Sequence, residues 1–189
     1  MAGVDAALNR FYSPLADTIA KTADKLDKPT VVAIIIVITF LVLLPLAGWR
    51  RGLGTCLSIG LGWLTTLPIK AVVAEPRPKG LDLPHNIHIH AATLSFPSGH
   101  VVFATALITA LTVVSSGRLT RVLVGIVGGV FILIVAWSRL YVGVHYTTDI
   151  VGGVINGIAG VFLFAGLWNI LFGWRTAPGK QVTDNIAED

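Results

Sequence analysis

Long uninterrupted runs of apolar residues dominate this chain and alternate with short polar segments. A helix needs about 20 mostly apolar residues to cross the hydrocarbon core of a bilayer. Stretches of about that length, with charged residues only near their ends, cover Thr30–Gly48, Leu53–Val73, Pro97–Ser116, Leu119–Ser138 and Thr148–Phe172. The pattern therefore predicts an all-α, polytopic membrane helix bundle with about five transmembrane helices.

The first 29 residues follow a different pattern, in which charged residues of both signs interrupt the apolar ones. Their larger apolar residues recur at helical spacing: Leu8, Phe11, Leu15, Ile19 and Leu26. Such a pattern is typical of an amphipathic helix that lies in the membrane interface. A cleaved signal peptide is not expected, because Asp5 precedes a stretch that is only weakly apolar. We therefore divide the chain into an interfacial segment (1–29), a transmembrane domain (30–174) and a polar tail (175–189).

Composition supports a membrane protein and argues against several other classes. Of the 189 residues, 54% are hydrophobic and 13% are charged, and the mean hydropathy is +0.79. These values do not fit a disordered chain, a nucleic-acid-binding arm or a typical cytosolic enzyme. The net charge of +4 comes from scattered basic residues, so no nucleic acid partner is expected. The single cysteine, Cys56, excludes a disulfide framework and a cysteine zinc site, and is expected to be a packing residue.

Basic residues in the connections indicate the orientation in the membrane. The short loops Trp49–Gly52 and Gly117–Thr120 hold arginines, and Arg121 and the tail add further basic residues. The positive-inside rule places these connections and the C-terminus in the cytoplasm. The loops at 74–96 and 139–147 are then expected to face outward.

Two pairs of small residues, four positions apart, predict where helices pack closely. They are Gly125 with Gly129, and Gly153 with Gly157. Small residues let helix backbones approach each other in membrane bundles. We expect both pairs to form contacts inside one chain rather than a dimer interface.

The unusual polar residues form three clusters that flank successive apolar stretches. In chain order they are Lys70 and Arg77; Ser98, Gly99 and His100; and Arg139, His145 and Asp149. The topology brings all three clusters to the same face of the membrane. Each residue alone has an ordinary explanation, such as a lysine that reaches the interface. Six ionisable residues near one membrane face are costly without a function, so the set as a whole indicates a site.

These residue types suit the binding of a phosphate group. Lys70, Arg77 and Arg139 would form an anion trap, since guanidinium groups match phosphate oxygens. Pro97 suits the first turn of a helix, and the free amides that follow it would point at a bound anion. The clusters therefore predict a phosphate-transfer site that needs no metal.

The two histidines of these clusters can divide the chemistry between them. His145 and Asp149 are four residues apart, so a helical turn would place them on one side. A carboxylate that holds one ring nitrogen leaves the other free to attack, and His100 would then donate a proton. The spacing favours His145 as the nucleophile, but the residues alone leave the choice between the two histidines open.

The clusters resemble the motifs of the type 2 phosphatidic acid phosphatase superfamily, the membrane lipid phosphate phosphatases. The family's first motif, Lys-x6-Arg-Pro, is matched from Lys70 to Pro78. Its second, Pro-Ser-Gly-His, is matched from Pro97 to His100, and its third, Ser-Arg-x5-His-x3-Asp, from Ser138 to Asp149. All three occur in order and without a departure at any motif position, which makes the resemblance highly specific.

The resemblance implies a role for each motif residue. His145 would form a phosphohistidine, Asp149 would orient it, and His100 would protonate the leaving oxygen and then act as the base for water. The phosphate would be held by Lys70, Arg77, Ser98, Gly99 and Arg139. No cofactor and no metal are implied.

The resemblance also implies a membrane lipid as the substrate and a bacterial plasma membrane as the location, with the site facing outward. An isoprenyl diphosphate is the first expectation, followed closely by phosphatidylglycerol phosphate and phosphatidic acid. This order rests on family analogy, because no residue of the chain distinguishes these lipids. No obligatory protein partner is predicted.

Other interpretations remain open at this point. The same site could transfer the phosphoryl group to another lipid or sugar instead of water. The chain could also be a non-enzymatic lipid-binding relative, although its intact motifs argue against that. His85, His88 and His90 form a tract that could bind zinc, but only Asp82 could add a carboxylate, so we favour a polar loop near the headgroups.

Overall fold

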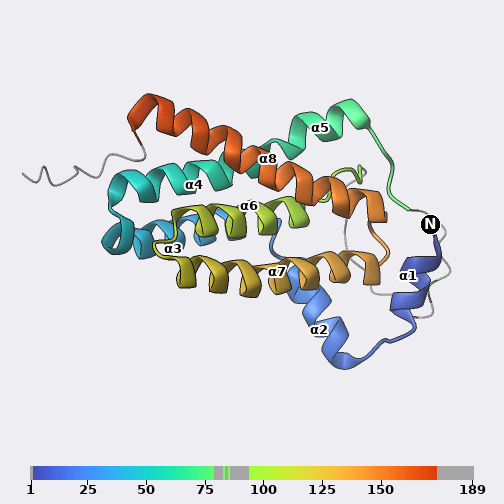
Figure 1. Ribbon diagram of the computed structural model, residues 1–189. Helices are drawn as coiled ribbons and strands as arrows, with labels where there is room; N and C mark the ends of the chain where they lie inside the picture. Colours follow the sequence, from blue (N-terminus) through green and yellow to red (C-terminus); the bar gives the residue numbers. More distant parts are fainter. Residues whose placement is uncertain (1, 79–82, 84, 86–93, 174–189) are drawn as a thin grey trace, which may run out of the picture.

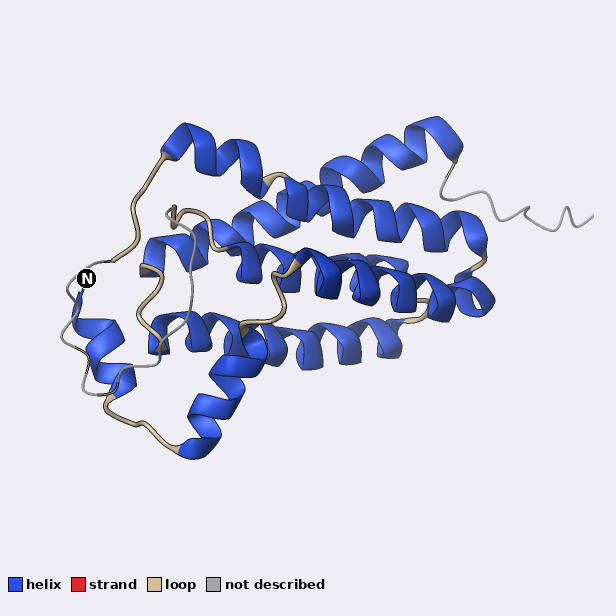
Figure 2. Cartoon of the chain, turned by 180° about the vertical axis from the view of Figure 1, so that it is seen from behind, coloured by secondary structure: helices blue, strands red, loops and turns tan. Residues whose placement is uncertain are grey.

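The computed structural model describes residues 2–78, 83, 85 and 94–173. These residues form helices and loops, with one isolated antiparallel bridge between Pro76 and Leu94 (Figure 2). In chain order the helices are α1 (Ala2–Asn9), α2 (Pro14–Ala23), α3 (Pro29–Ala47), α4 (Trp49–Leu64), α5 (Thr66–Val73), α6 (Gly99–Val114), α7 (Arg118–Tyr141) and α8 (Thr147–Phe172). The all-α prediction is confirmed. The predicted tail lies outside the described residues, and the division of the chain into three parts stays a prediction.

Four helical segments in the described part of the chain are long and apolar enough to cross a membrane. They are α3, the stretch Trp49–Val73 that contains α4 and α5, α7 and α8. Large apolar side chains such as Ile38, Ile126 and Phe162 are each more than half exposed on these helices, at 54%, 61% and 59%. Such surfaces are stable in lipid rather than in water. The protein is therefore an integral membrane helix bundle.

Helix α6 is shorter than the four long segments and lies in the middle of the bundle. It contacts α4, α7 and α8, and Val101, Phe103 and Ala106 on it are buried (Figure 1). The sequence predicted a span from Pro97 to Ser116, but Ser98 has extended backbone angles and caps the helix. The predicted count of five thus corresponds to four long spans and this shorter central helix.

The second predicted span is interrupted near its C-terminal end. Helices α4 and α5 are separated by Thr65, whose hydroxyl donates to the carbonyl of Gly62 at 2.6 Å. Pro68 lacks the N–H that would bond the carbonyl of Leu64, so the helical hydrogen-bond ladder breaks there. Figure 1 shows α5 leaving the line of α4, and this change of direction positions Lys70.

Glycines reverse the chain at the end of the bundle opposite the motif residues. Gly48 (φ 81°) lies between α3 and α4, and Gly117 (φ 83°) precedes α7. A side chain would be strained at both positions. The tight reversal places Arg50 and Arg51 in the first turn of α4, rather than in a loop as predicted. These reversals return the ends of the helices that carry the motifs to the other end of the bundle (Figure 1).

The N-terminal segment forms two helices rather than the single amphipathic helix predicted. Ser13 caps α2 by accepting from the N–H of Ala16 at 3.1 Å, and Pro14 opens its first turn. The buried face of α2 consists of alanines, which pack against Tyr141 and Val142 at the end of α7. Of the predicted apolar face, Phe11 and Leu15 are exposed. The segment therefore lies across the end of α7, where the motif residues are.

Small residues bring α8 close to α6. A Cβ at Gly153 or Gly157 would come within 3.0 Å of an α6 side chain, so the predicted contact at this pair is confirmed. The prediction for Gly125 and Gly129 is wrong, because a Cβ at either position would have no heavy atom within 4 Å. Their neighbour Gly128 faces α6 instead, since it lies on a different side of α7.

The contact between α4 and α8 depends on a pair of glycines. A Cβ at Gly160 would lie 2.8 Å from the Cα of Gly62, and backbone cannot yield as a side chain can. We expect Gly160→Ala to lower the stability of the purified protein by about 1–3 kcal/mol, as overpacking typically does. Thermal unfolding in detergent would measure this as a lower midpoint.

The matched control for this substitution is Gly166→Ala in the same helix. A Cβ at Gly166 would have no heavy atom within 4 Å, so the alanine would only add helix propensity. Its unfolding midpoint should equal or exceed that of the wild type. Equal midpoints for the Gly160 and Gly166 variants would contradict the importance of the backbone contact.

Candidate active site

The three motifs meet where α6 and α8 begin and α7 ends (Figure 1). Main-chain hydrogen bonds join them. The N–H of Ser98 donates to the carbonyl of Asp149 at 3.2 Å, and the N–H of Ser95 donates to the carbonyl of Glu75 at 2.8 Å. The segment before α6 is therefore fixed both to the start of α8 and to the segment that carries Arg77. All eight predicted site residues lie in the described part of the chain.

His145 lies between a carboxylate and a guanidinium group. Its Nδ1 is 3.0 Å from Oδ2 of Asp149, and its Nε2 is 3.0 Å from Nη1 of Arg77. A guanidinium group only donates hydrogen bonds, so Nε2 must accept. Nδ1 must then carry the proton and donate it to Asp149. The contacts thus select the tautomer in which Nε2 holds the lone pair that a nucleophile needs.

Asp149 is fixed by the way α8 begins. Its Oδ2 also accepts from the backbone N–H of Tyr146 at 2.9 Å, and the two residues form a capping box. The first turn of a helix favours a negative charge. The side chain of Asp149 is fully buried, and Oδ1 has no hydrogen-bond partner among the described residues.

The protonation state of His145 follows from its burial. The residue is 1% exposed, and burial lowers the pKa of its imidazole to about 4, although the hydrogen bond to Asp149 acts in the opposite direction. Arg77 lowers it further. The pKa of Arg77 is itself lowered by burial and raised by Asp149 and Asp27. At neutral pH the imidazole is neutral, as attack on phosphorus requires.

Lys70 fixes the segment that precedes α6. Its Nζ donates to the carbonyls of Leu94 (3.2 Å), Ser95 (3.1 Å) and Pro97 (2.9 Å). An ammonium group has three N–H donors, and these carbonyls match their number. In this conformation the three N–H groups of Lys70 hold the backbone that leads into the second motif. Its positive charge can therefore attract an anion at the site only over a distance, without a hydrogen bond.

The first turn of α6 presents the small residues of the second motif. Ser98 is fully buried, and its Oγ has no hydrogen-bond partner in the described part of the chain. Gly99 begins the helix, so its amide and those after it have no partner within α6. A buried hydroxyl beside free amides can receive an anion.

Arg139 is held by the N-terminal segment, which the motif analysis did not include. It is 1% exposed, and its Nη1 donates to Oδ1 of Asp24 at 2.8 Å. Its Nη2 donates to the carbonyl of Ala20 at 2.8 Å, and its Nε to Oγ of Ser138 at 3.2 Å. The arginine is thus rigidly oriented, and Asp24 balances its charge.

His100 faces the same N-terminal segment. Its Nε2 lies 3.1 Å from the carbonyl oxygen of Asp24, and its Nδ1 lies 3.6 Å from Oδ2 of Asp27. Oδ1 of Asp27 accepts from the indole N–H of Trp63 at 2.7 Å. The sequence analysis missed Asp24, Asp27 and Trp63. The only available signal was two aspartates three residues apart, directly before the first span.

Polar contacts hold the N-terminal helices onto His85 and α7. The side chain of Asn9 bonds both the N–H (2.7 Å) and the carbonyl (2.8 Å) of His85, and also the carbonyl of Tyr141 (3.0 Å). Asp17 accepts from the hydroxyl of Tyr141 at 2.7 Å and pairs with Nε2 of His85 at 2.9 Å. Tyr12 stacks on the ring of His85. His85 is therefore part of a structural contact.

The predicted alternative of a zinc site concerns residues of which the structure describes only His85. His88, His90 and Asp82 lie outside the described residues. Within the described ranges, no three histidine, cysteine or acidic side chains are grouped as metal ligands. His85 uses its ring on Asp17 and Tyr12.

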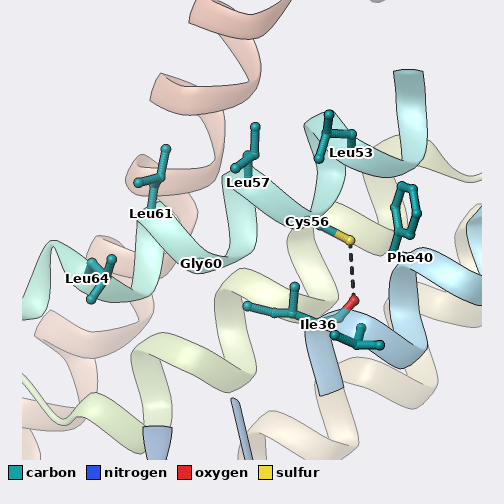
Figure 3. Close-up of a pocket in the computed structure, with 9 residues that line it drawn as sticks. Ile36, Phe40, Leu53, Cys56, Leu57, Gly60, Leu61 and Leu64 are labelled. Carbon is teal, nitrogen blue, oxygen red and sulfur yellow. Dashed lines mark hydrogen bonds between the residues drawn. The ribbon is translucent and has the colours of Figure 1, made fainter. Parts of the chain in front are cut away.

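An apolar groove on the side of the bundle is separate from the motif residues. It has a volume of about 410 Å³ and lies between α3 and α4. Its lining is Ile36, Val37, Phe40, Leu53, Cys56, Leu57, Gly60, Leu61 and Leu64 (Figure 3). The thiol of Cys56 donates to the carbonyl of Ile36 at 3.4 Å, which fits its expected packing role. No ionisable carboxylate, imidazole or cationic side chain lines the groove, so it offers no phosphate chemistry.

Sequence comparison identifies the family. The PAP2 superfamily profile matches residues 51–172. Phosphatidylglycerophosphatase B of Bacillus subtilis (strain 168) is 31% identical over 120 residues, which cover 61% of this chain and 57% of that protein. Undecaprenyl-diphosphatase BcrC of the same strain is 35% identical over 96 residues, which cover 51% and 47%. The chain spans about half the length of the curated relatives it matches.

Two solved structures share the fold. The first is a transmembrane PAP2 type phosphatidylglycerolphosphate phosphatase from Bacillus subtilis, with a TM-score of 0.73, 24% identity, and coverage of 88% of this chain and 83% of that one. The second is Aquifex aeolicus LpxE, with a TM-score of 0.66, 21% identity, and coverage of 86% and 92%. The profile match covers all three motifs and the helices that bring them together. The chain thus belongs to the PAP2 superfamily, the family that its motifs resemble.

Proposed function

We propose that the protein is a membrane lipid phosphatase that works through a phosphohistidine on His145 and needs no metal. The observation that carries the proposal is the arrangement around His145. Asp149 at 3.0 Å fixes the Nδ1–H tautomer, and Arg77 at 3.0 Å marks the direction in which Nε2 presents its lone pair. A buried, neutral imidazole that faces a cation is suited to attack an anion held by that cation.

The proposed reaction has two steps. Nε2 of His145 attacks phosphorus, the bond from phosphorus to the leaving oxygen breaks, and His100 gives that oxygen its proton. Water then attacks the phosphohistidine and loses a proton to His100, which breaks the P–N bond and releases inorganic phosphate. Asp149 stabilises the positive charge that His145 acquires, and Arg77 and Arg139 stabilise the phosphoryl oxygens.

We propose an isoprenyl diphosphate as the first candidate substrate, with phosphatidylglycerol phosphate and phosphatidic acid next. Relatives named undecaprenyl-diphosphatase and phosphatidylglycerophosphatase support the first two. A site at one end of a membrane bundle can take a headgroup while the lipid tail stays in the bilayer.

The proposed orientation puts the site outside the cytoplasm of a bacterial cell. Arg50, Arg51, Arg118 and Arg121 lie at the end of the bundle opposite the motif residues. The positive-inside rule favours that end as the cytoplasmic one. The motif residues and the N-terminal helices would then face outward.

The test is phosphate release by detergent-purified protein from a panel of the three lipids, with and without EDTA. Brief incubation with substrate labelled in the terminal phosphate, followed by denaturation, should leave an acid-labile label on His145. EDTA-resistant release with this label is the expected result. Release that EDTA abolishes, or folded protein that releases no phosphate from any of the lipids, would contradict the proposal.

A further inference from the structure

The turn between α2 and α3 lies directly over the phosphate-binding residues. It comprises residues 24–28 and carries Asp24 and Asp27. Asp24 bonds Arg139 at 2.8 Å through its carboxylate. Two carboxylates from outside the three motifs therefore approach groups that are expected to bind phosphate.

Asp27 occupies the space in front of the first turn of α6. A Cβ at Gly99 would overlap Oδ2 of Asp27 and lie 2.7 Å from its Oδ1, so this carboxylate covers the glycine of the second motif. The indole of Trp63 holds it there. A glycine in this position lets an anion approach the backbone closely. In this conformation the anion beside Gly99 is a carboxylate of the protein itself.

The same turn faces both ring nitrogens of His100. Nε2 faces the carbonyl of Asp24 at 3.1 Å, and Nδ1 faces Asp27 at 3.6 Å, where it makes no hydrogen bond. The side chain of His100 is 12% exposed. To protonate a leaving oxygen, one ring nitrogen must face the substrate, so the turn has to yield its place beside His100.

Charge balance favours an exchange between the turn and a phosphate group. The three cations Lys70, Arg77 and Arg139 interact electrostatically with Asp27, and Arg77 and Arg139 also with Asp24. With Asp149, three carboxylates face three cations in this conformation. If Asp24 and Asp27 move away, the excess of positive charge equals the two negative charges of a phosphomonoester dianion. The exchange therefore leaves no uncompensated buried charge, which would be costly.

We propose that Asp27 is an internal competitor for the phosphate site, and that the turn carrying it sets the affinity of the site for its substrate. This proposal rests on one part of the proposed function, namely that the site binds a phosphate group. The apparent affinity for phosphate is reduced by the fraction of molecules in which the turn is displaced. Removing the negative charge of Asp27 raises that fraction.

The test compares Asp27→Asn with the wild type in two measurements on the detergent-purified full chain. Isothermal titration with inorganic phosphate reports binding without turnover, and steady-state kinetics with a lipid phosphate report KM and kcat. If the turn is displaced in about one wild-type molecule in ten, and in nearly all molecules of Asp27→Asn, the Kd for phosphate and the KM fall by about tenfold in the variant. We expect a change of that size. Trp63→Phe, which removes the hydrogen bond to Asp27 but keeps an aromatic ring, should shift both values in the same direction by less.

Glu75→Gln is the matched control, because it removes the same charge from the segment that leads to Arg77. If its phosphate affinity rises as much as that of Asp27→Asn, the effect is general electrostatics and the proposal is overturned. An unchanged Kd in Asp27→Asn, or a fall in kcat with a shifted pH profile, also overturns it, since Asp27 would then position His100. If Asp27→Asn binds phosphate about tenfold more tightly but no lipid is hydrolysed by either protein, the competition stands and the proposed function fails.

Discussion

Replacing His145 with alanine should lower kcat for phosphate release by at least about 10⁴-fold. Losses of this size are typical when a covalent nucleophile is removed. The reason lies in the geometry: Nε2 of His145 holds the lone pair, while Nδ1–H is committed to Asp149 at 3.0 Å. Initial rates of phosphate release from the preferred lipid would measure the loss, and size-exclusion chromatography would show that the variant remains folded.

Two further variants separate nucleophile from proton donor. His100→Gln should still acquire the acid-labile label from substrate, because the P–N bond forms on His145, but its turnover should be slow. Asp149→Asn should retain the fold and lose most of the activity, since the amide can no longer stabilise the charged imidazole. If His145→Ala kept more than about a tenth of the wild-type kcat, or if only the His100 variant lost the label, the assignment of the nucleophile would be wrong.

The second large effect is expected for Arg77. Its Nη1 bonds both the carbonyl of Val144 at 2.7 Å and Nε2 of His145 at 3.0 Å. In the proposed mechanism it therefore positions the loop of the nucleophile and supplies charge to the phosphate. We expect Arg77→Ala to lower kcat/KM by about 10²–10³-fold, the range found when one donor to a developing charge is removed. Arg77→Lys should recover only a small part, because an ammonium group lacks the planar fork.

Arg50→Ala is the control for the loss of a guanidinium group. Arg50 lies over the ring of Trp49 at 5.4 Å, at the opposite end of the bundle. Its removal should leave kcat/KM within about twofold, as for surface positions away from the chemistry. Comparable losses in the Arg50 and Arg77 variants would mean that positive charge matters in general rather than at His145.

Most of the bundle could be predicted because apolar length and the motifs are both local signals. Both ends of α3 and the start of α8 differ from the predicted limits by one residue, and the end of α8 agrees. The break between α4 and α5 was not predicted, although Pro68 is visible in the sequence, because a proline near the end of an apolar run can also bend a continuous helix. Which glycine of α7 faces α6 depends on the rotation of the helix, and that is set by packing.

The candidate site was predicted only as far as its motifs extend. Its residues are brought together because they flank successive spans, and topology alone requires that. The contacts of Asp24, Asp27 and Asn9 depend on how the N-terminal helices fold back over α7 and His85. The cations that interact with the two aspartates lie far away in the chain, so the sequence indicated only an amphipathic helix for this segment.

The shortness of α6 affects how a lipid reaches the site. With 16 residues the helix is about 24 Å long, less than the roughly 30 Å of a hydrocarbon core. Its far end leads through Gly117 to Arg118. If Arg118 lies at the opposite interface, as the proposed orientation has it, the first turn of α6 lies at the level of the hydrocarbon rather than above the headgroups. In the proposed function, the phosphate group of a lipid would then reach the site while the lipid tail stays in the leaflet. The cost of extraction, about 0.8 kcal/mol for each methylene exposed to water, would not arise, and we expect long-chain lipids to be as accessible as short ones.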